Sequence, residues 1–399
     1  MRRFAAMLLA AAAGCARPAM PPPAPEPAPV DTTPPAPVDT APLDTVPRSE
    51  PAPAVVRGAL AVTLAFTGDI NLGTTTLPDG VPPDDGRGLL GRVDTLLRAD
   101  LVVGNFEGVL ADSGTSEKCL RRVPGRRAPA PRPNCHAFIT PTRLAPRLVE
   151  AGFTHLNLAN NHAQDLGPGG RLATDSILRS LGLETYGPLG RIALDTLRRG
   201  DSLTVVALVG FTTYPFAYNL LEIERSAAVV DSVRRLADVV VVTFHGGAEG
   251  ARAVHTDTTM EFLGNEPRGD LRRWARAVID AGAHAVVGHG PHVLRGIEFH
   301  RGRPIAYSLG NFLTYRGFNL SGPLGITGVL RLELGGNGAL RGARLAPLVQ
   351  IPRRGPVPDE RRRAIELVRR LSREDFGPTA ATIDDDGTIR PPPDPVASD

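Results

Sequence analysis

Short apolar runs alternate with longer amphipathic segments from residue 58 onward. The runs are rich in β-branched residues and are typical of strands buried on both faces: ALAVTLAFTGD, ADLVVGNFEG, GFTHLNLANNH, SLTVVALVGFT, ADVVVVTFHGG, GAHAVVGHGPH and RPIAYSLGNF. Helical patterns occupy the intervals, around residues 88–98, 141–151, 168–181, 225–237 and 269–282. Strands that alternate with helices in this way predict an α/β fold.

The C-terminal quarter carries two other patterns. Residues 325–351 alternate apolar and polar positions on either side of a Gly-Gly-Asn-Gly turn, which predicts a closing hairpin. Residues 358–373 have the apolar spacing of one amphipathic helix. The tail that ends the chain, DDDGTIRPPPDPVASD, has the composition of a disordered segment.

The first 56 residues differ from the rest in composition. MRRFAAMLLAAAAGC has two arginines, an apolar stretch too short to span a bilayer, and small residues before Cys15, which predicts a signal peptide over 1–15. Its last four residues resemble a bacterial lipobox, with Ala12 where Leu is more common, so we expect lipidation of Cys15; ordinary signal cleavage is the alternative. Residues 16–56 are dense in proline and should form an extended, disordered tether.

These features predict an exported protein that a lipid anchors in the bacterial cell envelope, on the outer surface of the inner membrane or in the outer membrane. The formal net charge of +3 over 399 residues is too small to indicate nucleic-acid binding. Lys118 is the only lysine. In an oxidising compartment, Cys119 and Cys135 predict a disulfide worth about 3 kcal/mol. Zinc binding by this pair is the alternative, although CxxC spacing is missing.

Polar side chains stand where five of the apolar runs end. They are Asp69 and Asn71, Asn105 and Glu107, Asn160 to His162, His245 and Glu249, and His289 and His292. Because sites in α/β sheets form beyond the carboxyl ends of strands, we expect these side chains to meet. Carboxylates, amides and imidazoles are ligands of divalent ions such as Zn, Mn or Fe, and this many donors would suit two ions. Taken singly, Asp69 could instead be a helix N-cap and Asn161 a turn residue.

The remaining histidines that we considered lie outside this pattern and are interpreted as ordinary surface or core residues. They are His155, His255, His284 and His300.

Six segments, in order from about residue 62 to residue 313, resemble the successive motifs of the CapA family of poly-γ-glutamate capsule synthesis proteins. They are TGDINLG, DLVVGNFEGVL, LNLANNHAQDLG, VVVTFHGGAE, GAHAVVGHGPHVLRGIE and IAYSLGNF. The fold of that family is similar to that of calcineurin-like metallophosphatases. The resemblance therefore implies a four-layer αββα β-sandwich over residues 57–352, followed by the C-terminal helix and tail at 353–399.

The resemblance also implies roles for the polar residues. His162 would stabilise or protonate the leaving oxygen, and Glu249 would support a ligand or touch the substrate. The implied metal ligands, for one or two divalent ions, are Asp69, Asn105, Glu107, Asn161, His245, His289 and His292.

Three positions depart from the pattern that the resemblance implies. Asn71 stands where phosphatases carry a histidine, which weakens one metal position. Gly290 stands where the family usually has a histidine, and Gly246 where it usually has a tryptophan. We expect the two glycines to widen the pocket.

The segment between the two cysteines, CLRRVPGRRAPAPRPNC, is rich in arginine. Arginine forks bind carboxylates and phosphates bidentately, so this loop could hold a polyanion such as poly-γ-glutamate; a merely soluble insertion is the alternative. The candidate polymer-binding residues are Arg121, Arg122, Arg126 and Arg127.

The sequence thus predicts an envelope lipoprotein with a metal-dependent hydrolase site that works on a phosphoester or a capsule-like anionic polymer. A non-catalytic component that binds or anchors the polymer for a membrane synthase is the alternative.

Overall fold

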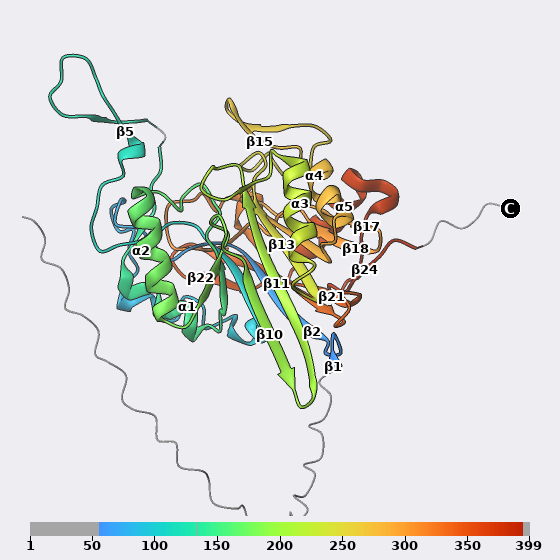
Figure 1. Cartoon of the computed structure of the whole chain (residues 1–399). Coiled ribbons are helices and arrows are strands. Elements are labelled where there is room, and N and C mark those ends of the chain that lie inside the picture. Colours follow the sequence, from blue (N-terminus) through green and yellow to red (C-terminus); the bar gives the residue numbers. More distant parts are fainter. Residues whose placement is uncertain (1–55, 134, 394–399) are drawn as a thin grey trace, which may run out of the picture. The chain divides into compact units, whose positions relative to one another are not determined.

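The fold is built on two eight-stranded sheets, seen here in a computed structural model that describes residues 56–133 and 135–393 (Figure 1). The first sheet has the order β22 (Gly355–Pro358), β21 (Leu340–Ile351), β20 (Ile326–Leu334), β2 (Val62–Asn71), β3 (Leu101–Phe106), β8 (His155–Asn157) and β9 (Glu184–Tyr186), with β19 (Asn311–Thr314) also paired to β2. The second has the order β1 (Val56–Arg57), β11 (Ser202–Thr212), β13 (Val239–His245), β16 (Ala285–His289), β18 (Arg303–Ala306) and β17 (Ile297–His300), with β10 (Ala193–Arg199) and β12 (Tyr218–Asn219) paired to β11.

The remaining elements are short strand pairs and helices. The pairs are β4 (Val109–Leu110) with β7 (Ile139–Thr140), β5 (Leu120–Arg121) with β6 (Ala130–Pro131), β14 (Glu261–Leu263) with β15 (Glu266–Gly269), and β23 (Thr382–Ile383) with β24 (Ile389–Arg390). The α-helices are α1 (Pro146–Glu150), α2 (Gly167–Ser180), α3 (Ile223–Val233), α4 (Leu271–Asp280) and α5 (Arg363–Phe376). The 3-10 turns are η1 (Asp84–Gly86), η2 (Asp94–Leu97), η3 (Glu117–Cys119), η4 (Thr142–Leu144), η5 (Gly322–Gly325) and η6 (Gly377–Thr379).

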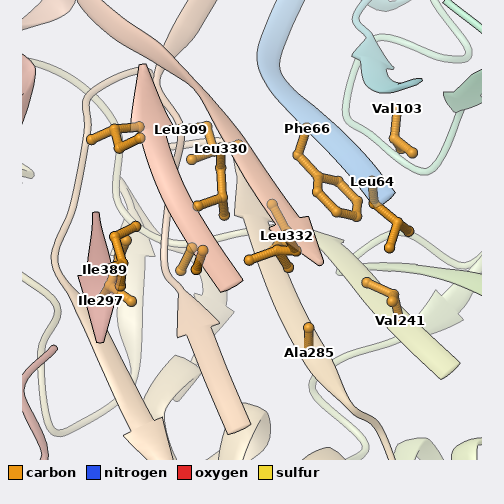
Figure 2. Packing of buried hydrophobic residues seen from close by; sticks show 14 of the residues in the cluster. Leu64, Phe66, Val103, Val241, Ala285, Ile297, Leu309, Leu330, Leu332 and Ile389 are labelled. Carbon is orange, nitrogen blue, oxygen red and sulfur yellow. The ribbon is translucent and has the colours of Figure 1, made fainter. Parts of the chain in front are cut away.

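Alternate residues of the central strands build the layer between the two sheets. Leu64 and Phe66 of β2 face this layer, whereas Ala65 packs with the outer cluster. Val241 of β13 also faces the inner layer, and Val240 packs outward. Figure 2 shows Leu64 and Phe66 of the first sheet close to Val241 of the second. The two-residue period of a strand therefore gives each sheet two apolar faces.

Helices cover both outer faces. Leu148 of α1 and Leu178 of α2 pack on the first sheet, and Val230 of α3 and Trp274 of α4 pack on the second. The layers are therefore helix, sheet, sheet and helix, and the predicted αββα sandwich is confirmed. The predicted hairpin is confirmed as well, because β20 and β21 pair antiparallel.

Three expectations about local structure differ from the observed elements. Residues 88–98 contain only the turn η2, because Gly88 and Gly91 interrupt the helical pattern. Residues 141–151 are divided between η4 and α1. We expected the tail to be disordered, but up to residue 393 it is part of the fold. It contains β24, and Ile389 of this strand packs in the inter-sheet core together with residues of α5.

The predicted signal peptide at 1–15, the lipidation of Cys15 and all but the last residue of the tether at 16–56 lie outside the described residues. Within the described residues, no helix is long and apolar enough to cross a membrane.

His284, which precedes β16, should make the fold sensitive to acid. Its Nδ1 lies 2.9 Å from the Val240 amide nitrogen, and burial together with Arg303 lowers the pKa of His284 to about 4. An unfolded histidine titrates near pH 6.5. The unfolded chain therefore binds the extra proton between about pH 6.5 and 4, so the free energy of unfolding falls as the pH falls through this window.

We expect His284→Gln to remove about 2 kcal/mol of the difference in unfolding free energy between pH 7 and pH 5, because its amide oxygen can accept the same hydrogen bond without titrating. Urea unfolding at pH 7 and pH 5 measures the effect. An unchanged difference between the two pH values would show that other groups carry the acid sensitivity.

Candidate metal centre and active site

Two pairs of neighbouring residues bring the predicted site together at one edge of the sandwich. Asp69 on β2 pairs in register with Asn105 on β3, and His245 on β13 pairs with His289 on β16. All four side chains are buried. The sheets meet here, because the Asn105 amide nitrogen donates to Asp69 Oδ1 (2.8 Å) and lies 3.2 Å from His245 Nδ1. The strand ends converge, as the sequence predicts.

Asp69, Glu107 and His292 form the centre of the cluster, each with a ligand atom within 4.8 Å of the others. His292 Nδ1 lies 3.0 Å from Asp69 Oδ2, and its Nε2 lies 3.8 Å from Glu107 Oε1. His289 Nδ1 is 3.5 Å from Asp69 Oδ1, and His245 Nε2 is 3.9 Å from Glu107 Oε1. Oxygen and nitrogen donors therefore surround one small volume.

Several of these atoms have no hydrogen-bond partner within the described part of the chain. They are both carboxylate oxygens of Glu107, Nε2 of His245 and both ring nitrogens of His289. Buried polar atoms are rarely left without a partner, because each costs about 1–3 kcal/mol. Carboxylate oxygens and imidazole nitrogens are ligands that divalent cations take. The residues present therefore fit a divalent metal ion.

The charges of the cluster also favour a cation. Burial raises the pKa of Glu107 well above its usual value, and burial lowers the pKa of His245 well below its own, which keeps that ring neutral. Burial opposes protonation of His292 too, but the neighbouring Glu107 and Asp69 raise the pKa of His292 to about 10. Without a metal the cluster holds a proton on His292, and we expect a cation to displace it.

Asn105 connects the two sheets but does not offer the cluster an oxygen. Its Oδ1 accepts hydrogen bonds from Asn157 (3.1 Å) and Asn160 (3.2 Å), so its nitrogen faces Asp69 and His245. An amide nitrogen that carries two hydrogens cannot bind a cation. In this orientation Asn105 positions Asp69 and His245 on either side of it, and its role as a metal ligand stays a prediction.

The contacts of Asn161 and Glu249 do not assign them a role. Asn161 Oδ1 is buried and has no partner among the described residues, so its role as a ligand stays a prediction. Glu249 Oε2 lies 3.7 Å from His292 Nε2, while its Oε1 accepts a hydrogen bond from the buried Arg268 (2.8 Å). Arg268 thus fixes Glu249 next to His292, and the catalytic role of Glu249 also stays a prediction.

The two glycines do not widen the pocket. A Cβ at Gly290, where φ is +110°, would lie 2.6 Å from Gly246 O, and one at Gly246 would lie 2.8 Å from Arg268 O. The glycines instead let two backbone segments close on each other beside the ligands. His292, two residues later, has a φ of 62°, a conformation that non-glycine residues adopt at a cost and often at functional sites.

His162 is held by a group of residues that the sequence did not predict to be together. Its Nδ1 lies 2.8 Å from Asp165 Oδ2, which leaves Nε2 toward Glu107 Oε1 (3.9 Å). Lys118 forms an ion pair with Asp165 and lies 3.3 Å from His162 Nδ1. Burial lowers the pKa of His162 to about 4; Asp165 opposes this shift and Lys118 adds to it. The single lysine of the chain is the signal that could have pointed to this contact.

We expect Lys118→Met to lower turnover about tenfold, because partners that orient an active-site ring typically contribute 10–100-fold. Removing the ammonium should also move the limb of the pH profile that belongs to His162 to higher pH, because Lys118 lowers the pKa of that ring. Metal content should not change. If turnover falls with no change in the pH profile, Lys118 acts only through the fold.

The arginine-rich segment is joined as predicted. Cys119 and Cys135 form a disulfide with their Cα atoms 5.3 Å apart. The hairpin of β5 and β6 extends outward from the body (Figure 1), and its four candidate polymer-binding arginines are exposed. Because Lys118 precedes Cys119 and contacts Asp165 and His162, the base of this hairpin lies beside the candidate site.

The histidines outside the pattern are confirmed as outside the cluster. Three of them pair with aspartates: His155 lies 2.8 Å from Asp195, His255 lies 2.7 Å from Asp375, and His300 lies 2.9 Å from Asp280. The fourth, His284, contacts the backbone amide of Val240.

Comparison with known proteins identifies the family. Residues 63–316, more than half of the chain, match the family described as bacterial capsule synthesis protein PGA_cap. The chain belongs to this capsule synthesis family. The predicted relation to CapA proteins is therefore confirmed, and the family match spans Asp69, Glu107 and His292.

Two curated relatives carry the CapA name. The PGA biosynthesis protein CapA of Bacillus subtilis (strain 168) is 26% identical over 64% of this chain and 63% of its own length. The capsule biosynthesis protein CapA of Bacillus anthracis is 30% identical over 56% of this chain and 52% of its own length. The chain thus spans between half and two thirds of the length of these relatives.

Solved structures with a similar arrangement are more distant. A 5'-nucleotidase precursor from Thermus thermophilus has a TM-score of 0.38 and 17% identity, with 78% of this chain and 59% of that chain covered. A purple acid phosphatase from yellow lupin seeds has a TM-score of 0.36 and 8% identity, with 77% and 55% covered. These scores do not bear on activity.

Proposed function

We propose that this family member is a metal-dependent hydrolase of the cell envelope that cleaves a phosphoester or a bond within a capsule-type anionic polymer. The observation that carries the proposal is the buried set of donor atoms without partners on Glu107, His245 and His289, next to Asp69 and His292. A divalent ion held by these residues would supply Lewis-acid activation of water and of the reacting oxygen. Mn, Zn or Fe, as one or two ions, would suit these ligands.

The residues around the ion would position and neutralise the substrate. Asp165 accepts the Nδ1 proton of His162, so that Nε2 faces the cluster. The imidazolium form, which the negative charge of a bound phosphate or carboxylate would favour, would then protonate the departing oxygen from Nε2. Arg268 holds Glu249 beside His292. In this proposal the protein is exported and anchored through lipidated Cys15, so that its site works near the membrane where the polymer is made.

The exposed arginines of the β5–β6 hairpin would hold the polymer. None of Arg121, Arg122, Arg126 and Arg127 forms an ion pair with a carboxylate of the described residues, so all four are free to bind carboxylates or phosphates of a ligand. A second candidate function, polymer binding for a membrane synthase without cleavage, is favoured by this hairpin alone.

Metal-dependent turnover distinguishes the hydrolase from the polymer-binding protein. Purified protein with Mn, Zn or Fe should release phosphate from aryl phosphates or shorten poly-γ-glutamate, and chelation should abolish the reaction. Binding of the polymer without metal-dependent turnover, lost when the four hairpin arginines become glutamine, would overturn the hydrolase proposal and support the second function.

A further inference from the structure

A second arginine-rich surface lies away from the metal cluster. It is a cleft of about 820 Å³ formed by the turn between β17 and β18, the β20–β21 hairpin and β24. Its arginines are Arg301, Arg303, Arg331, Arg341, Arg344 and Arg390, and Glu333 is the carboxylate among its lining residues. We call it the arginine cleft.

The cleft is at the opposite edge of the sandwich from the active site. Leu334, at the end of β20, pairs with Val62 at the start of β2, whereas Asp69 lies near the other end of β2. Seven residues of strand separate Val62 from Asp69, which corresponds to about 23 Å at roughly 3.3 Å per residue. An anionic group bound in the cleft therefore does not touch Asp69 or the residues around it.

The fold places like charges together in the cleft. Arg331 on β20 and Arg344 on β21 are direct cross-strand partners, an arrangement in which like charges repel. The two side chains are held by carbonyl oxygens, Arg331 by Arg98 O and Arg344 by Asp386 O (3.1 Å). A carbonyl oxygen orients a guanidinium group but does not neutralise its charge.

Four of the six cleft arginines form no ion pair within the described residues, although the Asp386 carboxylate lies near Arg344 and Asp280 near Arg303. Arg301 pairs with Asp280 (2.7 Å) and Arg390 with Asp384 (2.6 Å), but the others form no ion pair with the described residues. The others are Arg303, Arg331, Arg341 and Arg344. Burial and the neighbouring Arg301 lower the pKa of Arg303, as expected where positive charges crowd together.

We propose that the arginine cleft binds a polyanionic chain that carries carboxylates or phosphates along its length. Six guanidinium groups around one hollow offer more forks than a single phosphate can engage, and they can bind successive anionic groups. A recessed surface also favours a chain over the flat face of a bilayer. The inference extends the proposed function, because the same polymer could reach both the cleft and the active site, but the binding does not require turnover.

The test removes the cross-strand pair with Arg331→Gln/Arg344→Gln. Binding of the full mature chain to poly-γ-glutamate, to inorganic phosphate and to phosphatidylglycerol vesicles is measured by calorimetry or sedimentation. The expected result is a loss of about tenfold or more in polymer affinity, since hydrogen bonds between charged groups are lost. The matched control is Arg234→Gln/Arg235→Gln, which alters two exposed arginines that pair with Asp231 near the end of α3.

Stability keeps the test interpretable. Without ligand, the double variant should melt at the same temperature as the parent or higher, because the repulsion between Arg331 and Arg344 is gone. Unchanged polymer affinity overturns the proposal. Loss of vesicle binding alone overturns it in favour of a membrane surface, and inorganic phosphate that binds as tightly as the polymer overturns it in favour of a small-anion site.

A variant of the metal cluster distinguishes the cleft proposal from the hydrolase proposal. Asp69→Asn should abolish turnover and leave the contribution of the cleft to polymer binding unchanged. If no form of the protein turns over substrate while the cleft variant still loses polymer affinity, the hydrolase proposal fails and the cleft proposal stands.

Discussion

Asp69→Asn should remove the metal ion and lower turnover by about 10³-fold or more, since Lewis-acid stabilisation of the reacting oxygen contributes several kcal/mol. Asp69 lies between His289 and His292 at the centre of the cluster, and both rings lower the pKa of this buried carboxyl well below its usual value against the effect of burial. Asparagine keeps the size and the acceptor for the Asn105 amide but removes the charge that draws a cation. Elemental analysis and turnover measure the two effects.

Thermal unfolding provides a readout besides activity. In chelator, Asp69→Asn should be less stable than the parent, because the buried, protonated His292 loses one of the carboxylates that raise its pKa. Added metal should raise the melting temperature of the parent only, because a ligand stabilises the state that binds it. The matched control is Asp195→Asn, which alters the partly exposed partner of His155. Asp195 lies on β10, where it pairs in register with Val206 of β11. Metal that stabilises both variants equally would place the ion elsewhere.

The sequence predicted the convergence of the site because convergence follows from local rules. Parallel strands that end in polar residues bring those residues to one edge, and the register of β2 with β3 and of β13 with β16 does so directly. The four layers were implied by the resemblance of the motifs, and the alternation along β2 and β13 agrees with them.

What the sequence did not predict depends on contacts between distant segments. The direction in which the Asn105 amide points is fixed by Asn157 and Asn160, about fifty residues away, and a motif does not carry that information. The close backbone approach at Gly246 and Gly290 is likewise a property of the fold. A glycine in place of a large residue can mean empty space or a closer backbone, and only the fold distinguishes the two.

The two groups of arginines also differ in whether the sequence alone could predict that they lie together. The hairpin arginines stand together in the sequence between two cysteines and were predicted to act together. The cleft arginines are spread from residue 301 to residue 390 and come together only because β18, β20, β21 and β24 end near one another. A cluster of charged residues can be predicted from the sequence only when its members are close together along the chain.

His162→Asn should lower turnover by about 10²–10⁴-fold on substrates whose leaving group is a poor one, such as an alkyl alcohol, and much less on p-nitrophenyl phosphate. The reason is geometric. Asp165 fixes the Nδ1 side of the ring, so that the remaining nitrogen, Nε2, faces Glu107 and the cluster. A group there assists an oxygen that leaves with high basicity, whereas nitrophenolate leaves without help. Asparagine can still donate to Asp165, so the surrounding contacts with Lys118 should persist.

The leaving-group comparison separates assistance to the departing oxygen from other roles. Metal content should be the same in His162→Asn and in the parent, because His162 Nε2 lies 3.9 Å from Glu107 Oε1 and its Nδ1 is bound by Asp165. His300→Gln, an alteration of a histidine that pairs with Asp280 outside the site, is the matched control and should leave turnover unchanged. An equal loss on good and poor leaving groups, with metal retained, would assign His162 to substrate binding. A loss of metal would make it a ligand, and the departing oxygen would then have to be stabilised by the cation alone.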